Sequence, residues 1–343
     1  MLPENIRFTT DPVKTLCDFL KERKYSKAVV LLDEQSKTHC YPILQGLPVH
    51  ETIVIPDGEE NKNLRSCEII WQRMTDLHID RHAVMIIVGG GVLGDMGGFC
   101  AATYKRGIDF VLVPTTLLAQ VDASIGGKLG IDFNNYKNHI GVFQQPILTL
   151  LFSGFLSTLP PTELRSGFAE VIKHILISDK ELWDLIRSLP LEKQPWDKLI
   201  KHSVEFKADI VTKDPREKGL RKILNAGHTI GHALETYFIN INQRILHGEA
   251  IAIGLIAEGF IALNSGKLSE SELSQIVGFI TSVYGTVEIT NDQIEEIAKL
   301  ALQDKKNKNN RILCVLQKGI GSATWDNEIS IENLKKALEY YCS

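Results

Sequence analysis

The chain has 343 residues, of which 38 are lysine or arginine and 42 are aspartate or glutamate, so its formal net charge is −4. Hydrophobic residues make up 44% and charged residues 23%, as in ordinary globular proteins. This composition excludes a disordered chain, and the lack of a global positive charge argues against a polyanion-binding protein. The length predicts about two domains of roughly 100–200 residues each.

The N-terminus and the apolar segments favour a cytoplasmic location. The first residues, MLPENIRFTTDP, are polar and acidic where a signal peptide would have a basic start and an apolar stretch. The longest apolar segment, residues 250–263, is interrupted by Glu258 and is shorter than the ~18 residues of a membrane span. The 6 cysteines form no CxxC pair, which fits a reducing compartment. We expect a protein that binds neither a membrane nor nucleic acid.

Helix and strand patterns alternate in the first half of the chain. Apolar residues at helical spacing predict helices at residues 13–20 and 64–77. Short apolar runs predict strands at residues 27–33, 51–58, 83–91 and 109–116. Near-continuous apolar strands separated by helices indicate a parallel sheet covered on both faces. The sequence thus predicts an α/β N-terminal domain with a Rossmann-like sheet.

The second half of the chain has helical periodicity almost to its end. The predicted helices lie at residues 162–177, 198–211, 228–238 and 248–264, and only residues 312–317 are typical of a strand. Pro160 and Pro161 stand at the change of pattern. We therefore predict an α/β domain at residues 1–158 and a mostly α-helical domain at residues 159–343.

A glycine-rich turn follows the predicted strand at residues 83–88. The segment GGGVLGD, residues 89–95, contains the spacing GxGxxG before a predicted helix. Glycines let backbone amides approach a phosphate, and a helix N-terminus adds partial positive charge. The motif favours a phosphate or dinucleotide site, while a tight turn without a ligand remains the alternative.

Histidines and one carboxylate form a second candidate site. His228 and His232 are four residues apart and share one helix face, and His247 begins the next predicted helix. Glu170 is a carboxylate on an otherwise apolar helix face. Three protein ligands with an open fourth position are typical of catalytic zinc. The spacing does not separate metal ligands from proton-transfer residues, and each histidine alone could be a satisfied polar group.

Basic residues accompany these motifs although the chain is slightly acidic. Lys128 stands among glycines and apolar residues, and Lys173 lies one helical turn after Glu170. Lys207, Arg221 and Lys222 flank the segment of His228, and for Arg221 and Lys222 a solvated face is the alternative. Cations gathered around a site suggest an anionic substrate with a phosphate or carboxylate.

A series of longer motifs runs along nearly the whole chain, in the order PDGE (56–59) with Lys62, GGGVLGD (89–95), YKRG (104–107), PTTLLAQVD (114–122), GGK (126–128), KN (137–138), GFAEVIK (167–173), LNAGHTIGH (224–232) and HGE (247–249). With these motifs in this order, the sequence resembles the 3-dehydroquinate synthase family. As a set they are far more specific than any single motif.

The resemblance implies NAD and one divalent metal, zinc or cobalt, as cofactors. The implied metal ligands are Glu170, His228 and His247. The implied catalytic residues are His232, Glu217 and Lys173. The implied substrate contacts are Arg106, Asp122, Lys128, Asn138, Lys207, Arg221, Asn225 and one of Lys305 and Lys306. The implied NAD contacts are Asp33, Asp57, Glu59, Lys62, Gly90, Gly91, Val92, Gly94, Asp95, Thr115, Thr116, Lys128, Lys137, Phe155, Leu156, Ser157 and Thr158.

The implied reaction converts 3-deoxy-D-arabino-heptulosonate 7-phosphate to 3-dehydroquinate and phosphate. The resemblance implies a carbon–oxygen lyase of the shikimate pathway, which leads to chorismate and the aromatic amino acids. It also suggests a homodimer. Ala226, Leu129 and His139 depart from the family pattern. The alternatives are a sibling sugar phosphate cyclase of inosose or valiolone type, a metal-dependent polyol dehydrogenase, and a non-catalytic regulator.

Overall fold

The computed structural model describes residues 2–134, 136–243, 245–302 and 312–343. The chain divides into two compact units, unit 1 at Met1–Leu164 and unit 2 at Arg165–Ser343. The division falls shortly after the sequence-based boundary between residues 158 and 159. The assignment of one function to each part stays a prediction.

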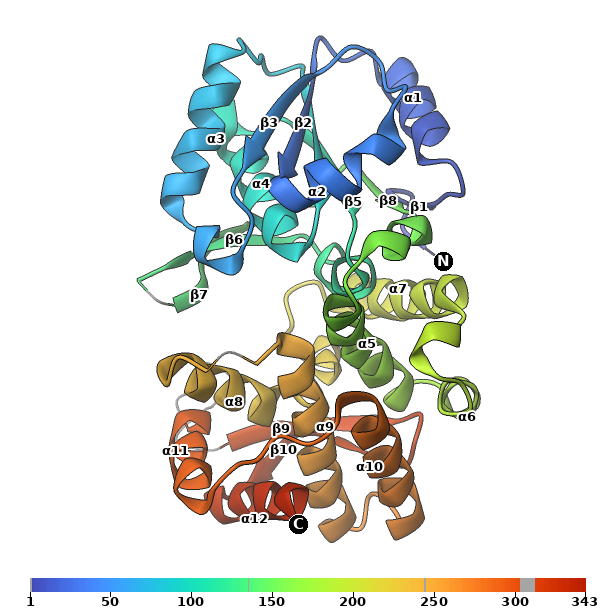
Figure 1. The fold of residues 1–343 in the computed structure, drawn as a ribbon, viewed down its shortest axis with the longest axis vertical. Coiled ribbons are helices and arrows are strands. Elements are labelled where there is room, and N and C mark those ends of the chain that lie inside the picture. The colour runs from blue at the N-terminus through green and yellow to red at the C-terminus, as the bar shows by residue number, and fades with distance from the viewer. Residues whose placement is uncertain (1, 135, 244, 303–311) are drawn as a thin grey trace. The chain divides into compact units, whose positions relative to one another are not determined.

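Unit 1 contains a six-stranded parallel sheet in the order β1-β8-β5-β4-β2-β3 (Figure 1). Its strands are β1 (Ile6–Phe8), β2 (Ala28–Asp33), β3 (Glu51–Ile55), β4 (Val84–Gly89), β5 (Asp109–Pro114) and β8 (Leu148–Leu151). Its helices are α1 (Pro12–Arg23), α2 (Glu34–His39), α3 (Leu64–Asp76) and α4 (Gly91–Thr103). The predicted Rossmann-like α/β class and the predicted strands β2, β3, β4 and β5 are confirmed.

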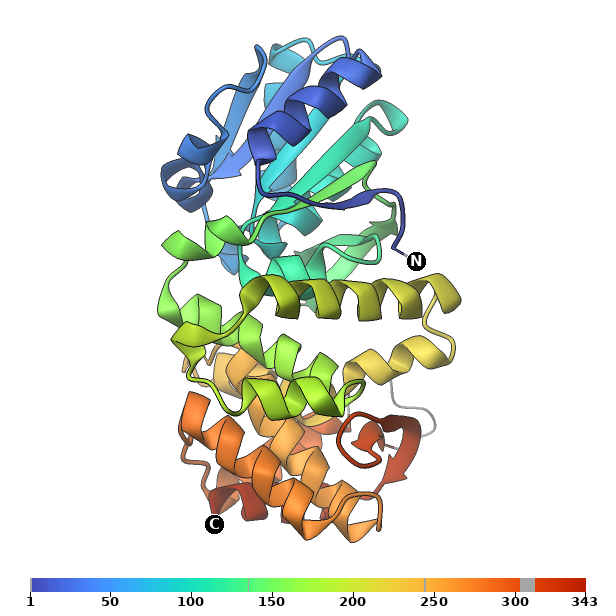
Figure 2. The same cartoon turned by 90° about the vertical axis from the view of Figure 1, so that its right-hand side faces the viewer.

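Alternating side chains place an apolar core on each face of this sheet. Val29 and Leu31 of β2 join the cluster that α3 and α4 cover, and Val30 and Leu32 join the cluster that α1 covers. Successive residues of a strand point to opposite faces, so a strand buried on both sides must be apolar throughout. Figure 1 shows α1 and α3 on opposite sides of the sheet, and in Figure 2 α1, in dark blue, lies over the strands.

The sequence patterns did not predict every strand of unit 1. β1 and β8 were not predicted, nor was the antiparallel hairpin of β6 (Lys128–Phe133) and β7 (Tyr136–Phe143). Most side chains of β7 are exposed, so the strand lacks the apolar run that marks a buried one. Local pairing between the two strands defines the hairpin.

Unit 2 is mostly helical, as predicted. Its elements are α5 (Pro161–Leu176), which begins at the end of unit 1, α6 (Lys180–Ile186), α7 (Trp196–Lys213), α8 (His228–Asn240), α9 (His247–Asn264), α10 (Glu270–Tyr284), α11 (Asn291–Ala301), β9 (Ile312–Gln317), β10 (Ala323–Ile329) and α12 (Ile331–Cys342). The expectation of a single strand was wrong, because β10 pairs antiparallel with β9. Its sequence, ATWDNEI, is polar, and only the last of its seven residues is buried, so β10 lacks the apolar run that marks a buried strand.

Glu258 interrupts the apolar segment of α9 and is fully buried within unit 2. None of the helices in the described ranges combines the length and the apolar character that crossing a membrane requires.

Close packing of α4 on the sheet predicts a specific cost for one substitution. A Cβ added to Gly97 would lie 2.6 Å from Leu31 Cδ2 and 3.2 Å from two carbons of Ile87. We expect Gly97→Ala to destabilise unit 1 by about 1–3 kcal/mol, because overpacking displaces neighbouring side chains. Thermal unfolding followed by circular dichroism measures the effect.

Gly278→Ala provides a matched control. Gly278 lies inside α10 with no atom within 4 Å of the added Cβ. There the exchange should be neutral or stabilising by up to about 1 kcal/mol, because alanine has the higher helix propensity. Equal unfolding midpoints for Gly97→Ala and wild type would contradict the packing argument.

Candidate functional site

The glycine-rich turn of unit 1 forms the start of α4. β4 ends at Gly89, and Gly90 is the N-cap of α4 without a side chain to bond its first amides. A Cβ on Gly90 would lie 3.2 Å from Thr116 Cγ2, and a Cβ on Gly91 would lie 3.2 Å from Ala123 Cβ. Larger residues would therefore press on the neighbouring segment. Such a turn leaves helix N-terminal amides open to an anion.

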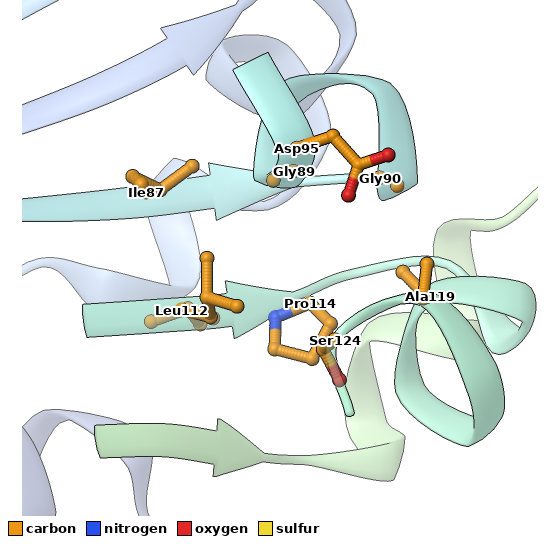
Figure 3. Close-up of a pocket in the computed structure, with 12 residues that line it drawn as sticks. Ile87, Gly89, Gly90, Asp95, Leu112, Pro114, Ala119 and Ser124 are labelled. Carbon is orange, nitrogen blue, oxygen red and sulfur yellow. The ribbon is translucent and has the colours of Figure 1, made fainter. Parts of the chain in front are cut away.

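A pocket lies beside this turn. Figure 3 shows it between the turn that carries Gly90 and Asp95 and the segment that carries Pro114, Ala119 and Ser124. Its lining residues are Ile87, Gly89, Gly90, Gly91, Gly94, Asp95, Leu112, Val113, Pro114, Ala119, Ala123 and Ser124. Four of the residues predicted from the family resemblance are thus brought to one pocket, namely Gly90, Gly91, Gly94 and Asp95.

A buried lysine links three of the predicted residues at the edge of this region. Lys62, with 4% of its surface exposed, donates from Nζ to Asp95 Oδ2 and to Asn138 Oδ1, each at 2.7 Å. Burial alone would lower the pKa of Lys62, but the carboxylates of Asp95 and Glu59 outweigh burial and raise it. Lys62 therefore stays charged, and it holds Asp95 on α4 and Asn138 on β7 in fixed positions.

The remaining predicted residues of unit 1 divide into packed and exposed groups. Phe155 and Leu156 are buried, and Phe155 belongs to the core under the sheet, so their side chains serve packing. Thr115 is buried and donates its amide to Gly89 O, and Asp33 caps α2 beside Gly89. The half-buried residues are Asp57, Glu59, Val92, Thr116 and Asp122. The exposed residues are Arg106, Lys128, Lys137, Asn138, Ser157 and Thr158. Their ligand contacts stay predictions.

The candidate metal centre lies wholly within unit 2. Glu170 projects from α5, and His228 and His247 are the first residues of α8 and α9. One donor atom from each side chain lies within 4.8 Å of the other two. Glu170 Oε1 lies 3.6 Å from His228 Nε2 and 3.4 Å from His247 Nε2. The predicted ligand set therefore converges, and a carboxylate with two imidazoles suits zinc.

Neighbouring acceptors orient both imidazoles toward Glu170. His228 Nδ1 lies 3.0 Å from Ala226 O, and His247 Nδ1 lies 3.1 Å from Glu235 Oε2. An acceptor at Nδ1 holds the proton there and leaves the Nε2 lone pair for a metal. The other carboxylate oxygen of Glu170, Oε2, pairs with the Lys173 ammonium. This arrangement matches the outer contacts of known metal-binding histidines.

The electrostatics of the centre favour a positive charge at its middle. Burial alone would lower the pKa of His247, but hydrogen bonds and charges of Glu170 and Glu235 outweigh burial and raise this pKa to about 10. Two carboxylates thus stabilise a cation at the position of the imidazole. A divalent metal ion would satisfy the same demand, so the residues fit a metal.

His232 lies beside the three candidate ligands but outside their set. It follows His228 by one turn of α8, with ring centroids 5.1 Å apart, and its ring lies 6.3 Å from that of His247. The sequence alone did not divide the histidines into ligands and proton-transfer residues. The geometry of unit 2 separates His232 from the converging group.

A short segment before α8 holds several predicted substrate and acid–base residues. Glu217 Oε1 accepts a hydrogen bond from Asn225 Nδ2 at 2.6 Å. Arg221 has 3% of its surface exposed and donates from Nη1 to Pro215 O. Asp214 accepts from the amides of Lys218, Gly219 and Arg221, and these bonds lower its pKa. The carboxylate therefore fixes the loop that carries Glu217 and Arg221.

Asp214 and Glu235 were missed by the sequence analysis. Asp214 directly precedes Pro215, and Gly219 follows four residues after the proline. This composition is typical of turns that an aspartate stabilises. Glu235 follows His232 by three residues and so lies on the same helix face. Both signals are present in the sequence but are common in proteins without such a site.

The other predicted positions are placed as follows. Lys207 of α7 is buried, and Lys222 pairs with Asp326 on β10. Lys305 and Lys306 lie outside the described residues. The three departures from the family pattern replace none of the candidate ligands: Ala226 contacts His228 Nδ1 through its backbone carbonyl, Leu129 packs on Gly98, and the ring of His139 lies 5.3 Å from that of Tyr136 in a tilted arrangement.

Comparison with protein families assigns the chain. The family model described as 3-dehydroquinate synthase N-terminal matches residues 52–166, and the model described as 3-dehydroquinate synthase C-terminal matches residues 167–307. The chain therefore belongs to the 3-dehydroquinate synthase family. The 3-dehydroquinate synthase of Parabacteroides distasonis is 35% identical over 99% of this chain and 98% of its own length. That of Campylobacter jejuni subsp. doylei is 35% identical over 98% and 99% of the two chains.

Solved structures agree with this fold. The 2-epi-5-epi-valiolone synthase of Streptomyces hygroscopicus, solved with NAD⁺ and Zn²⁺, is 26% identical and superposes with a TM-score of 0.87 over 99% of this chain and 97% of its own. A 2-deoxy-scyllo-inosose synthase complexed with carbaglucose-6-phosphate, NAD⁺ and Co²⁺ is 22% identical, with a TM-score of 0.85 over 98% and 96%. The glycerol dehydrogenase of Schizosaccharomyces pombe superposes with a lower TM-score of 0.68 at 15% identity, over 100% and 89%.

The contact between Glu235 and His247 predicts how one substitution affects metal binding. Glu235→Gln keeps the size of the side chain but removes the charge that favours the Nδ1 proton. We expect zinc affinity to fall about 10- to 100-fold, as for other residues behind metal ligands. Competition with a chromophoric chelator measures the dissociation constant.

Glu181→Gln, an exposed glutamate of α6, is the control and should bind zinc as wild type does. Unchanged affinity in Glu235→Gln would show that its hydrogen bond does not support a metal site.

Proposed function

We propose that the chain is a 3-dehydroquinate synthase that converts 3-deoxy-D-arabino-heptulosonate 7-phosphate to 3-dehydroquinate and phosphate. The observation that carries the proposal is the convergence of Glu170, His228 and His247 in a chain whose two family models cover most of its length. We further propose that it acts as a phosphate-eliminating lyase and as a homodimer, in the cytoplasm. The family relationship supports these finer assignments.

The pocket of unit 1 would bind NAD. Two observations support this proposal. The glycine turn at the start of α4 presents backbone amides that suit a pyrophosphate, and Asp95, Gly90 and Gly91 line the pocket. Bound there, NAD would supply reversible hydride transfer, so that the substrate alcohol could be oxidised and reduced again within one turnover. Lys62 would hold Asp95 and Asn138 in place for ligand contact, since its ammonium is already bonded to both.

Unit 2 would hold the metal and orient the substrate. Glu170, His228 and His247 would hold the metal, which would supply Lewis-acid polarisation of a substrate oxygen. Arg221 and Lys207 would bind the substrate carboxylate and hydroxyls, for which a guanidinium is suited by its paired donors. Asp214 would keep Arg221 and Glu217 positioned by fixing their loop.

Two groups of unit 2 would transfer protons. His232 is placed beside the ligand set without belonging to it, and its imidazole would take a proton from a substrate hydroxyl. Glu217 would serve as a second acid or base, with Asn225 orienting its carboxylate through the Nδ2 hydrogen bond. Oxidation of the substrate at C5 would acidify the C–H of C6, and removal of that proton would expel the phosphate from C7 by β-elimination.

Two other classes of enzyme share this fold. The sibling cyclases are 22–26% identical, below the 35% of the dehydroquinate synthases of Parabacteroides and Campylobacter. A polyol dehydrogenase would release NADH with its product, and a non-catalytic regulator would turn nothing over. These differences make one assay decisive.

The assay combines the purified protein with the heptulosonate phosphate, a catalytic amount of NAD and zinc. We expect inorganic phosphate and a carbocyclic product in equal amounts, with no net NADH. Glucose 6-phosphate, the parent sugar of carbaglucose-6-phosphate, is the comparison substrate and should release no phosphate. NADH accumulating in step with product would contradict the proposal, and so would a preference for glucose 6-phosphate.

Paired variants distinguish a metal ligand from a proton-transfer residue. We expect His247→Ala to lose metal and activity together, because one of three ligands is removed. His232→Ala should keep stoichiometric zinc while kcat falls about 10²–10⁴-fold, the usual contribution of general acid–base catalysis. Metal content by atomic emission and kcat are measured on the same preparations.

The assignment of ligand and proton-transfer residues would be wrong if His247→Ala kept its metal with a native circular dichroism spectrum. It would also be wrong if His232→Ala lost its metal.

A further inference from the structure

Glu258 is a fully buried carboxylate in the middle of the apolar helix α9. Burying a carboxylate is costly unless hydrogen bonds and charge compensate it. Its oxygens accept hydrogen bonds from two backbone amides of another segment, Oε2 from Gly227 N at 2.6 Å and Oε1 from Thr229 N at 3.2 Å. The chemistry of the proposed reaction gives Glu258 no role, so its burial calls for a different explanation.

The two amides belong to the N-terminus of α8, which lacks a capping side chain of its own. The N-cap is Gly227, in the left-handed conformation with φ +76°, and no side chain from the cap bonds the first turn. The first amides of a helix need acceptors, and a negative charge at this end is favoured by the helix dipole. Glu258 supplies both from the neighbouring helix.

We propose that Glu258 is a positioning residue for the metal centre. The inference rests on the metal site of the proposed function. The two amides that Glu258 binds flank His228, the first residue of α8, while His247 is the first residue of α9, the helix that carries Glu258. One carboxylate therefore ties the backbone of one histidine to the helix of the other.

Packing between the two helices leaves little freedom to replace this link. A Cβ on Gly227 would lie 3.0 Å from Ile251 O, and a Cβ on Gly254 would overlap the backbone of Gly227. Thr229 adds a hydrogen bond from Oγ1 to Leu313 O on β9. With α8 and α9 already in backbone contact, loss of a hydrogen bond at Glu258 cannot be relieved by a closer approach, so the backbone at His228 must shift instead.

The test is Glu258→Gln in the full-length chain, with zinc and cobalt ions as probes. The amide keeps the size of the carboxylate but offers one acceptor, and its NH₂ group faces the second backbone N–H. We expect the zinc dissociation constant, measured by chelator competition, to rise about 10- to 100-fold. The visible absorption of the Co²⁺-loaded protein should also change, because this spectrum reports ligand geometry.

Glu272→Gln is the matched control for a loss of capping alone. Glu272 lies in the first turn of α10, a helix that carries none of the candidate metal ligands, and accepts from the amides of Ser269 and Ile320 at 3.0 and 3.1 Å. This variant should lose thermal stability but keep the wild-type dissociation constant and Co²⁺ spectrum. Because Glu272 is less buried than Glu258, the metal readouts carry the comparison and the stability loss serves only to show that a cap was removed.

Glu258→Asp covers the case in which Glu258→Gln does not fold. The shorter side chain keeps the charge but withdraws the carboxylate from α8, so we expect a smaller rise in the dissociation constant with the same change in spectrum. Wild-type affinity and spectrum in a folded Glu258 variant would overturn the role of Glu258 alone. Absence of metal binding in the wild-type protein would overturn the proposed function and this role with it.

Discussion

The structure of unit 2 depends on how the carboxylate of Glu170 is compensated inside the protein. Glu170 is fully buried, and an ionised carboxylate there would cost several kcal/mol without partners. One oxygen faces the imidazoles of His228 and His247, and the other pairs with Lys173. The position of Glu170 on α5 therefore determines where compensating positive charge is needed. Lys173 is buried because it pairs with the buried carboxylate of Glu170.

Small residues make this convergence possible. Gly248, next to His247, packs directly against the backbone of Ser166, one turn before Glu170 on α5, and its amide donates to Ser166 Oγ. A Cβ on Gly231 would lie 3.1 Å from Ala250 O, so α8 also lies directly against α9. Any larger residue at these positions would separate the helices and with them the ligands. The glycines that allow the helices to approach each other therefore also set the distances between the candidate metal ligands.

Patterns that repeat along the sequence were sufficient to predict most of the fold. The strands β2 and β4 were predicted because burial on both faces requires apolar residues at every position, and α8 and α9 because their apolar faces repeat at helical spacing. β10 was missed because an exposed edge strand needs no such pattern. The supporting contacts of Asp214 and Glu235 were missed for another reason: they depend on which backbone amide or imidazole folding brings near.

The charge pairs also depend on contacts that folding creates and that the composition of the sequence does not show. The chain has a net charge of −4, yet Lys62 and Lys173 are buried. Each is bonded to a carboxylate of the protein, Asp95 for Lys62 and Glu170 for Lys173, so the pairs contribute nothing to the net charge. An anionic substrate would have to compete with those carboxylates for the two ammonium groups. Both ammonium groups therefore hold protein carboxylates in place, and the contact of Lys62 with NAD and the catalytic role of Lys173 stay predictions.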